Sequence, residues 1–218
     1  MPYIDIHTHD PSAGGDVIKV VSVFPGEEVI FSSESSVVYT AGLHPWHIEK
    51  ADMKNSINRI EEWLVKGMIK GVGETGLDAL RGPGMQLQQE VFMEHIRISE
   101  KYDCPLIVHC VKTYNEILNL RRSSKAKQPW ILHGFNSSVQ MMRQMTESGI
   151  FISLGPALLK NKKLWNVCSE VPDSMFFLET DVSDADIKDI YAKAAELRGI
   201  GTEELKQIIF KNYNSIFK

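Results

Sequence analysis

From residue 52 onward, hydrophobic and polar positions alternate between two patterns. Short runs of about five β-branched or apolar residues are typical of buried strands. Each run is followed by a segment in which apolar residues recur roughly every three to four positions, which is typical of amphipathic helices. Such repeats indicate parallel strands joined by right-handed crossovers. The predicted strands are Met68–Gly73, Pro105–Cys110, Pro129–His133, Ile150–Leu154 and Met175–Glu179.

Capping residues mark several of the helices between these strands. Asp52 precedes a helical segment that ends at Gly67. Thr113 followed by Glu116 has the spacing of a capping box. The other predicted helix boundaries are Ser137 or Ser138 with Gly149, and Asp184 with Gly199.

The N-terminal residues have a different pattern. Tyr3–His9, Val17–Phe24 and Val37–Leu43 predict three strands, and the segments between them have no helical periodicity. Together with the later five, they give the eight strands of a closed parallel barrel. The chain has 218 residues, fewer than the roughly 250 of a typical barrel of this kind. We therefore expect one α/β domain over residues 1–218, a shortened TIM-type parallel β/α barrel whose early helices are missing. An open doubly wound sheet is the structural alternative.

Composition narrows the class of protein. Residues are 43% hydrophobic and 24% charged, as in an ordinary globular domain, and no apolar run is long enough to cross a membrane. The net charge of −4 does not indicate a protein that grips long duplex nucleic acid. The N-terminal residues have no basic stretch followed by an apolar run, so no secretory signal is expected. Three cysteines without CxxC spacing favour reduced thiols, and we expect a cytoplasmic protein.

The most specific local signal is the segment from Asp5 to His9, with sequence Asp-Ile-His-Thr-His. Alternate side chains of a strand share a face, so Asp5, His7 and His9 are expected to point the same way. Two imidazoles so spaced can converge on one metal ion, and imidazole is the commonest metal ligand. Polar residues near a chain start are the plainer interpretation of this motif taken alone.

Further candidate ligands lie at the C-terminal ends of predicted strands, where a barrel builds its active site. They are Glu74, His109, His133 and Asp181. A single histidine that closes a strand is more often structural, but six such side chains at one rim are not expected by chance. Four imidazoles and two carboxylates suit borderline divalent ions, and a carboxylate can bridge two of them. The sequence therefore predicts a two-metal site.

In order along the chain, the motifs resemble those of the TatD family of metal-dependent hydrolases, many of which are deoxyribonucleases. The resemblance rests on these segments and spans nearly the whole chain: Asp5–His9, Gly42–Pro45, Gly73–Asp78, the strand that ends in His109, Leu132–Phe135, Glu179–Asp181 and Asn212–Phe217. It implies hydrolysis of phosphodiester bonds in DNA by a hydroxide that bridges two divalent ions, which are Zn, Mg, Mn, Ni or Fe.

The resemblance also implies roles for individual residues. His7 and His9 would bind the first ion, His109 and His133 the second, and Glu74 would bridge the pair. Asp181 would bind the first ion and act as general base, so Asp181 and Glu74 are the expected catalytic residues. The expected substrate-binding residues are His44, Arg81 and Lys112. Asp5 would orient a histidine, and Asp78 would stabilise the segment that carries Glu74.

The sequence departs from the family pattern at two points, and these leave alternatives open. His109 is followed by Cys110 and Val111 where the family usually has Ser-Arg, and Asp181 is followed by Val182 and Ser183 where it has a small residue and proline. The expected partner is DNA or a small phosphoester, with no membrane contact. The first alternative is a metallohydrolase that acts on another small ester, a lactone or an amide. The second is a metal-binding scaffold without turnover.

Overall fold

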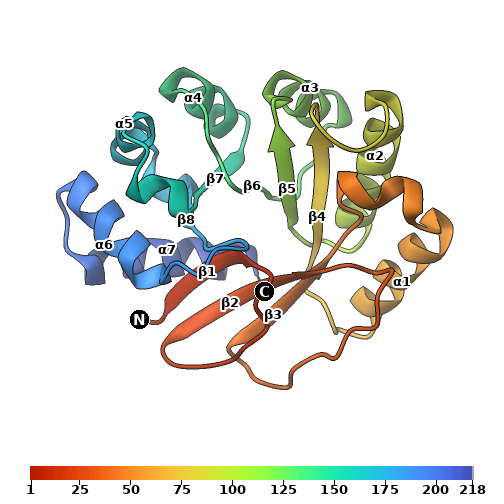
Figure 1. Ribbon diagram of the computed structural model, residues 1–218, viewed down its shortest axis with the longest axis horizontal. Helices are drawn as coiled ribbons and strands as arrows, with labels where there is room; N and C mark the ends of the chain where they lie inside the picture. Colours follow the sequence, from red (N-terminus) through yellow and green to blue (C-terminus); the bar gives the residue numbers. More distant parts are fainter. Residues whose placement is uncertain (218) are drawn as a thin grey trace.

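The structure is a computed structural model that describes residues 1–217. Over this range, eight strands pair in parallel in one sheet whose order follows the chain from β1 to β8 (Figure 1). The strands are β1 (Tyr3–Thr8), β2 (Val17–Val23), β3 (Val37–Ala41), β4 (Gly71–Asp78), β5 (Leu106–Val111), β6 (Trp130–Leu132), β7 (Ile150–Leu154) and β8 (Phe176–Leu178).

The sheet closes on itself where β1 meets the residues after β8. The backbone N–H of Asp181 donates to the carbonyl of His7 (2.9 Å), and that of His9 donates to the carbonyl of Asp181 (3.3 Å). Thr8 and Asp181 form a parallel bridge. The predicted TIM-type barrel is confirmed. The open doubly wound alternative is excluded, because such a sheet reverses its strand order and leaves two edges.

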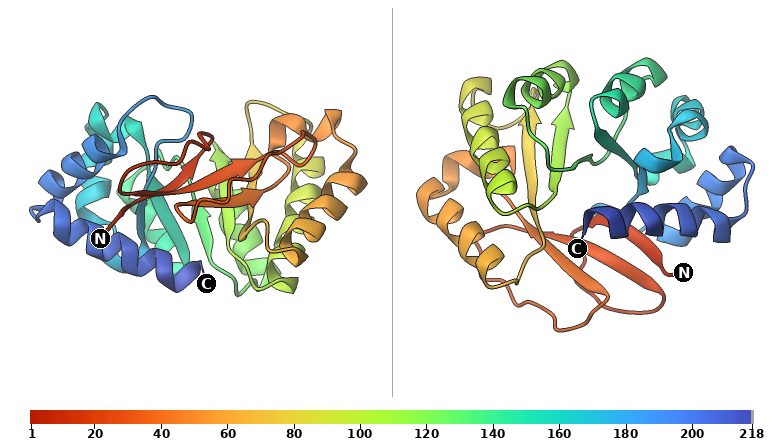
Figure 2. Two further views of the ribbon diagram at one scale, coloured as in Figure 1. Left: turned by 90° about the horizontal axis from the view of Figure 1, so that it is seen from below. Right: turned by 180° about the vertical axis from the view of Figure 1, so that it is seen from behind.

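Helices connect only the later strands. Between β1, β2 and β3 the described residues form no helix, as expected from the sequence. Figure 2 shows these three strands on one side of the molecule, with the helices gathered around the others. The α-helices are α1 (Met53–Val65), α2 (Met85–Lys101), α3 (Tyr114–Ser124), α4 (Val139–Glu147), α5 (Lys163–Glu170), α6 (Ile187–Arg198) and α7 (Thr202–Ile216), and the short 3-10 helices are η1 (Pro45–Lys50), η2 (Pro156–Leu159) and η3 (Asp173–Met175). We call residues 1–44 the helix-free segment and residues 45–217 the helix-bearing segment.

The fourth strand differs from its predicted range. Met68–Gly73 was expected, but the strand covers Gly71–Asp78, so Glu74 lies inside it rather than at its end. The glycines at 71, 73 and 76 interrupt the apolar run that marked the strand. The backbone nevertheless pairs with β5 at Val72 and again from Thr75 to Asp78, with a shift of register between them.

Two of the predicted helix starts are confirmed. The side chain of Asp52 accepts from the N–H of Asn55 (3.0 Å), and that of Ser138 accepts from the N–H of Met141 (3.2 Å). The capping box at Thr113 is wrong, because its hydroxyl donates to the carbonyl of Leu77 instead of capping α3.

Other helix boundaries also differ from the prediction. α6 is capped by Asp186, not by Asp184, because the Asp186 carboxylate accepts from the N–H of Lys188. α5 and α7 follow Lys162 and Gly201, which make no side-chain cap, so the sequence carries no start signal for them.

One apolar core fills the space between the sheet and the helices. Trp130, Phe92, Phe176 and Phe177 are fully buried in it. The three cysteines are buried free thiols. In the part of the chain that the structure describes, no helix is both long and apolar enough to cross a membrane.

Candidate metal centre

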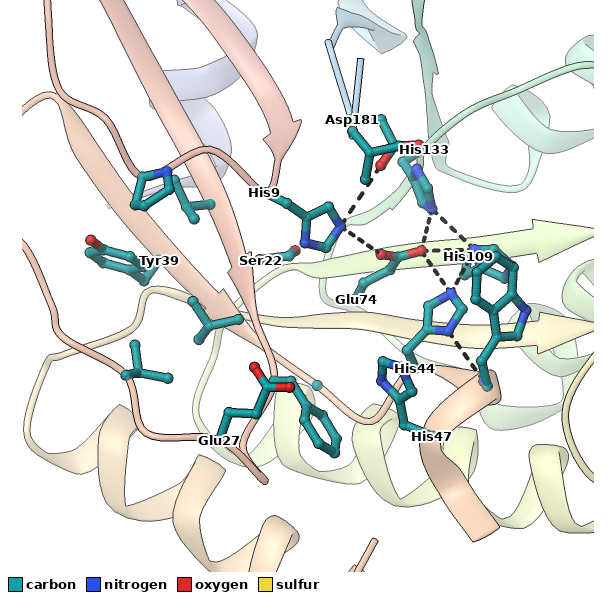
Figure 3. Close-up of a pocket in the computed structure, with 18 of the residues that line it drawn as sticks. His9, Ser22, Glu27, Tyr39, His44, His47, Glu74, His109, His133 and Asp181 are labelled. Atoms are coloured by element: carbon teal, nitrogen blue, oxygen red, sulfur yellow. Dashed lines mark hydrogen bonds and ion pairs between the residues drawn. The ribbon is translucent and has the colours of Figure 1, made fainter. Parts of the chain in front are cut away.

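Glu74 lies at the centre of a group of imidazoles at the C-terminal ends of the strands (Figure 3). Its Oε1 is 2.7 Å from His109 Nδ1 and 2.7 Å from His133 Nε2. His44 Nε2 lies 3.2 Å from the same oxygen. One side of the buried carboxylate is therefore lined by three histidines that come from three different strand ends.

The other carboxylate oxygen faces the start of the chain. Glu74 Oε2 is 3.4 Å from His7 Nε2 and 3.4 Å from His9 Nε2. Asp181 Oδ1 lies 3.5 Å from His7 Nε2 and 3.8 Å from His9 Nε2. Glu74 thus separates two sets of candidate ligands, and the helix-free segment supplies His7 and His9.

Two glycines let the backbones of β3, β4 and β5 approach closely enough to place Glu74. A Cβ at Gly42 would lie 2.6 Å from the Glu74 carbonyl oxygen. Gly73 has a φ of +132°, and a Cβ there would lie 2.4 Å from the carbonyl oxygen of Ile107. Only glycine fits such an approach.

Asp181 is held by the closure of the barrel. Its backbone has a φ of +54°, a left-handed conformation that Asp tolerates better than most residues. The residue before it, Thr180, donates from its backbone N–H (2.9 Å) and from its hydroxyl (2.5 Å) to the carboxylate of Asp5. Asp5 was expected to orient a histidine; it instead fixes the turn that carries Asp181. Burial raises the pKa of Asp5 to about 6, although the bonds from Thr180 oppose that change.

His7, on the first strand, has a polar partner on the ring nitrogen that faces away from Glu74. His7 Nδ1 lies 3.2 Å from Ser22 Oγ, which is 2.9 Å from Thr40 Oγ1. In the neutral ring, which is the form that binds a metal ion, an Nδ1–H that donates to Ser22 leaves the lone pair of Nε2 directed at the cluster. The Nε2 atom is buried and has no hydrogen-bond partner among residues 1–217.

His109 and His133 show the same arrangement. His109 Nε2 lies 3.3 Å from Asp78 Oδ2, and His133 Nδ1 lies 3.5 Å from Glu179 Oε1. The second nitrogen of each ring points at Glu74. A carboxylate behind an imidazole is the common arrangement around a bound metal, because it fixes the tautomer that exposes a lone pair to the ion.

His44 differs from these histidines because it directs an N–H, not a lone pair, at Glu74. Its Nδ1 accepts a hydrogen bond from the backbone N–H of Trp46 (3.2 Å). The neutral ring then carries its proton on Nε2, which faces Glu74 Oε1. Burial lowers the pKa of His44, so the neutral ring is favoured. His44 is therefore arranged as a hydrogen-bond donor at the cluster.

The cluster perturbs its own carboxylates and imidazoles. Burial alone would raise the pKa of Glu74, but His133, His109 and His44 hold it well below its ordinary value. Burial and the proximity of His133 oppose protonation of His7, yet Asp181 and Glu74 raise its pKa to about 9. The carboxylates and imidazoles of the cluster thus stabilise each other's charged forms against the cost of burial.

The donor atoms form three sets in which each ligand atom lies within 4.8 Å of the others. They are His7 with His9 and Asp181, His7 with Glu74 and His133, and His44 with Glu74 and His109. Imidazole and carboxylate donors of this kind suit borderline divalent ions. The buried Nε2 of His7 and the imidazole–carboxylate pairs fit such ions, so the residues present are compatible with a metal centre.

A cavity of about 730 Å³ opens beside the cluster. His9, His44, His109, His133 and Asp181 line one side of it together with Glu74. The opposite side is formed by β2, β3 and the connection between them. Figure 3 shows Tyr39 and Glu27 on this side, away from Glu74.

Arg81 and Lys112 lie outside this cavity lining, as far as the described residues show. Arg81 is exposed, and its guanidinium lies over the ring of Trp46 at 3.7 Å from the ring centroid. Lys112 is also exposed, with a φ of +59° after the end of β5. Their proposed contacts with substrate stay predictions.

Several residues that support the cluster were not predicted from the sequence. Ser22, Thr40 and Glu179 contact each other or the histidines, but single hydroxyl and carboxyl groups within or just after a strand have no distinctive spacing. His95 is fully buried in α2. Its Nε2 accepts from the N–H of Leu43, beside His44.

The structure also shows the hydrogen bonds of Asp78 and the buried environment of Cys110. Asp78 accepts hydrogen bonds from the N–H groups of Leu80 and Arg81, which stabilises the segment after β4, and from the indole of Trp46. Burial raises the pKa of the Cys110 thiol to about 11, so it is protonated at neutral pH and is not an activated nucleophile.

Comparison with known proteins gives a consistent result. The sequence profile of the TatD related DNase family matches residues 26–218. A protein of Buchnera aphidicola described as an uncharacterized metal-dependent hydrolase is 31% identical over 150 residues, which cover 67% of this chain and 56% of that protein. The metal-dependent hydrolase YjjV of Escherichia coli is 26% identical over 195 residues, covering 81% of this chain and 74% of YjjV.

The crystal structure of YjjV, a TatD homologue, superposes with a TM-score of 0.85 at 22% identity and covers 99% of this chain and 97% of that one. The deoxyribonuclease Tat-D of Schizosaccharomyces pombe is 24% identical over 168 residues, which are 70% of this chain and 53% of Tat-D.

Proposed function

Because the chain belongs to the TatD family of metal-dependent hydrolases, we propose that it hydrolyses phosphoester bonds at the Glu74 cluster. We propose two divalent ions as the cofactor. His7, His9 and Asp181 would hold one, His109 and His133 the other, and Glu74 would lie between them. The single observation that supports this most strongly is that both oxygens of Glu74 face histidines, two on one side and three on the other.

When bound, divalent ions would supply a more acidic water and would neutralise the charge that develops on an ester oxygen. In the hydrolysis, the oxygen of water attaches to phosphorus and the bond to the leaving oxygen breaks. Asp181 lines the cavity, and its carboxylate takes the proton from water and returns one to the leaving oxygen. Burial would raise the pKa of Asp181, but the nearby imidazole of His7 lowers it, so Asp181 is ionised and ready to accept a proton at neutral pH.

His44 and the residues behind the other histidines have different roles in this proposal. The N–H of His44 Nε2 points into the cluster and donates to an oxygen of the bound ester. Ser22, Asp78 and Glu179 keep the other histidines in the tautomer that turns a lone pair inward. These groups are fixed by strand ends before substrate arrives, which lowers the cost of organising them during the reaction.

The test is hydrolysis of bis(p-nitrophenyl) phosphate by the full chain after removal of bound metal and addition of Zn²⁺ or Mn²⁺. We expect activity that EDTA abolishes. Asp181→Asn should lower kcat by roughly 10²- to 10⁴-fold, as expected for loss of a general base. Asp184→Asn, at an exposed carboxylate outside this cavity, is the matched control and should leave kcat unchanged. Metal binding without turnover of any ester would favour the scaffold alternative.

DNA is the first substrate candidate. It is supported by the name of the family and by the similarity to the Tat-D deoxyribonuclease. Trp46, partly exposed at the edge of the cavity, offers a ring on which an unpaired base can stack. Release of nucleotides from a short single-stranded oligonucleotide by the metal-loaded protein tests this candidate directly.

A small phosphoester is the second candidate, and the cavity favours it. Among the described residues, no lysine or arginine lines the cavity, whereas proteins that hold nucleic acid usually place several against its phosphates. The cavity volume of about 730 Å³ is typical of a site for a small molecule.

A further inference from the structure

The cavity beside the cluster extends from the inside of the barrel to its outer face. Ser22 lines it and points inward, toward His7. Side chains alternate along a strand, so Val21 and Val23 on either side of Ser22 point outward, yet both also line the cavity. The cavity therefore passes over the end of β2.

The outer part of the cavity exists because a helix is missing. In a complete β/α barrel, a helix between β2 and β3 would cover this face. Here residues 24–36 connect the two strands without a helix. Part of this connection lines the cavity, and its Phe31 packs edge-to-face on Tyr39, which also lines the cavity.

The outer part of the cavity is apolar, and we call it the apolar arm. It is formed by Val21, Val23, Phe24, Val29, Ile30 and Tyr39. Ile30 is 90% exposed, so residues 1–217 leave this large hydrophobic side chain of the arm almost uncovered. Burying apolar surface here would remove it from water at a favourable free energy.

The charges around the apolar arm are negative. Glu27 and Glu28 are exposed and line the cavity on the same connection. No lysine or arginine among residues 1–217 lines the cavity near these two carboxylates. A second phosphate that entered the arm would face like charge, which opposes binding.

We infer that the apolar arm binds an uncharged apolar substituent of the substrate, so that the preferred substrate is a small phosphoester with one apolar group and not a nucleic acid chain. This inference rests on the proposed function, because the scissile phosphoester must reach the Glu74 cluster. The cluster receives the single charged group, and the arm receives the alkyl or aryl group attached to it.

The experiment uses p-nitrophenyl phosphodiesters that share one leaving group and differ in the second substituent. Methyl, butyl and hexyl p-nitrophenyl phosphate are compared with the p-nitrophenyl ester of thymidine 5′-phosphate and with a short single-stranded oligonucleotide. The full chain is loaded with Mn²⁺ or Zn²⁺. We expect kcat/KM to rise by about two- to fourfold per added methylene, as for burial of apolar surface, and to be higher for the hexyl ester than for the thymidine ester.

Two substitutions connect the effect to the arm. Val29→Asn should raise KM for the hexyl ester by about tenfold and leave the methyl ester unchanged, and Val65→Asn, at an exposed valine outside the cavity, is its control. Glu27→Lys should raise kcat/KM for the oligonucleotide relative to the hexyl ester. Glu34→Lys, on the same connection but outside the cavity lining, should not.

The outcomes separate the two proposals. Two results would overturn the role of the apolar arm and leave phosphoester hydrolysis in place. The first is a kcat/KM that does not depend on the length of the alkyl substituent. The second is a preference for the oligonucleotide together with no effect of Val29→Asn. Failure to hydrolyse any of these esters with either ion overturns the proposed function itself.

Discussion

The helix-free and helix-bearing segments contribute to one cluster but hold their side chains in different ways. His7 lies on β1 and is supported by a chain of hydroxyl groups from β2 and β3, Ser22 and Thr40. His109 and His133 in the helix-bearing segment are supported by carboxylates, Asp78 and Glu179. A barrel can lose two covering helices and keep its centre, because the strand ends, not the helices, carry the ligands.

The two segments also differ in what surrounds the strands. In the helix-bearing segment, helices exclude solvent from the outer face, as the fully buried Val167 and Met142 show. In the helix-free segment, the outer face of β2 opens into the cavity. The comparison shows that a strand without a covering helix exposes its outer face to a cavity, while its inner face still contacts the cluster.

The largest expected effect comes from Glu74, which contacts histidines of both segments. Glu74→Gln removes the charge that faces all five histidines, so we expect loss of bound metal and a fall in phosphodiester hydrolysis on the order of 10³-fold. Metal content by mass spectrometry and kcat measure it. Glu62→Gln, at an exposed carboxylate on α1, is the control. Full metal content in Glu74→Gln would mean that the two segments do not share a centre.

His95 links the two segments and gives the next largest effect. Its Nδ1 donates to the carbonyl of Val91 (2.7 Å) and its Nε2 accepts from Leu43, so the ring must be neutral. Burial lowers its pKa from 6.5 to about 4. Its contribution to stability is therefore complete above pH 6.5 and is lost as the pH falls toward 4, by about 3 kcal/mol.

Urea unfolding at several pH values checks this prediction. His95→Gln keeps a donor and an acceptor but does not titrate, so the wild type should lose about 3 kcal/mol more than the variant between pH 6.5 and pH 4. Equal losses in the two proteins would show that His95 does not connect α2 to the end of β3 in this way.

The sequence predicted the barrel and the side chains of the cluster. It did not predict the residues that support those side chains. Asp5–His9 and the residues at strand ends were recognisable because imidazoles and carboxylates are rare beside apolar runs. The structure brings the other five proposed ligands together with Glu74 in one cluster. That they bind metal stays a prediction.

The supporting contacts could not be predicted in the same way. Ser22 and Glu179 depend on register between strands far apart in sequence, and the donor role of His44 depends on a bond to Trp46 that only the turn geometry creates. The boundaries of β4 were misplaced because its glycines serve close packing and hide the strand pattern.

A matched pair of variants compares the two kinds of support. Ser22→Ala removes the hydroxyl behind His7, and Asp78→Asn removes the charge behind His109. Each should weaken metal affinity by roughly 10- to 100-fold, with the larger effect at Asp78 because a carboxylate stabilises the imidazole more than a hydroxyl does. Competition with a fluorescent chelator measures both. An unchanged affinity in Ser22→Ala would show that His7 needs no support from β2.

The smallest expected effect concerns packing. Val167→Ala in the helix-bearing segment should lower the free energy of unfolding by about 2 kcal/mol, because Val167 is fully buried. Val23→Ala, on the half-buried outer face of β2, should cost less than about 1 kcal/mol. Chemical denaturation of the two variants compares them. A larger loss at Val23 would mean that the outer face of β2 is better covered than the structure indicates.

The most direct test of the account is a crystal structure of the full chain grown with Zn²⁺ or Mn²⁺, in which anomalous scattering locates the ions. We predict ions on both sides of the Glu74 carboxylate, one bound by His7 and His9 of the helix-free segment and one by His109 and His133 of the helix-bearing segment. Ions bound only away from Glu74, or a cluster in which one segment provides no ligand, would contradict the claim that the two segments build one metal centre.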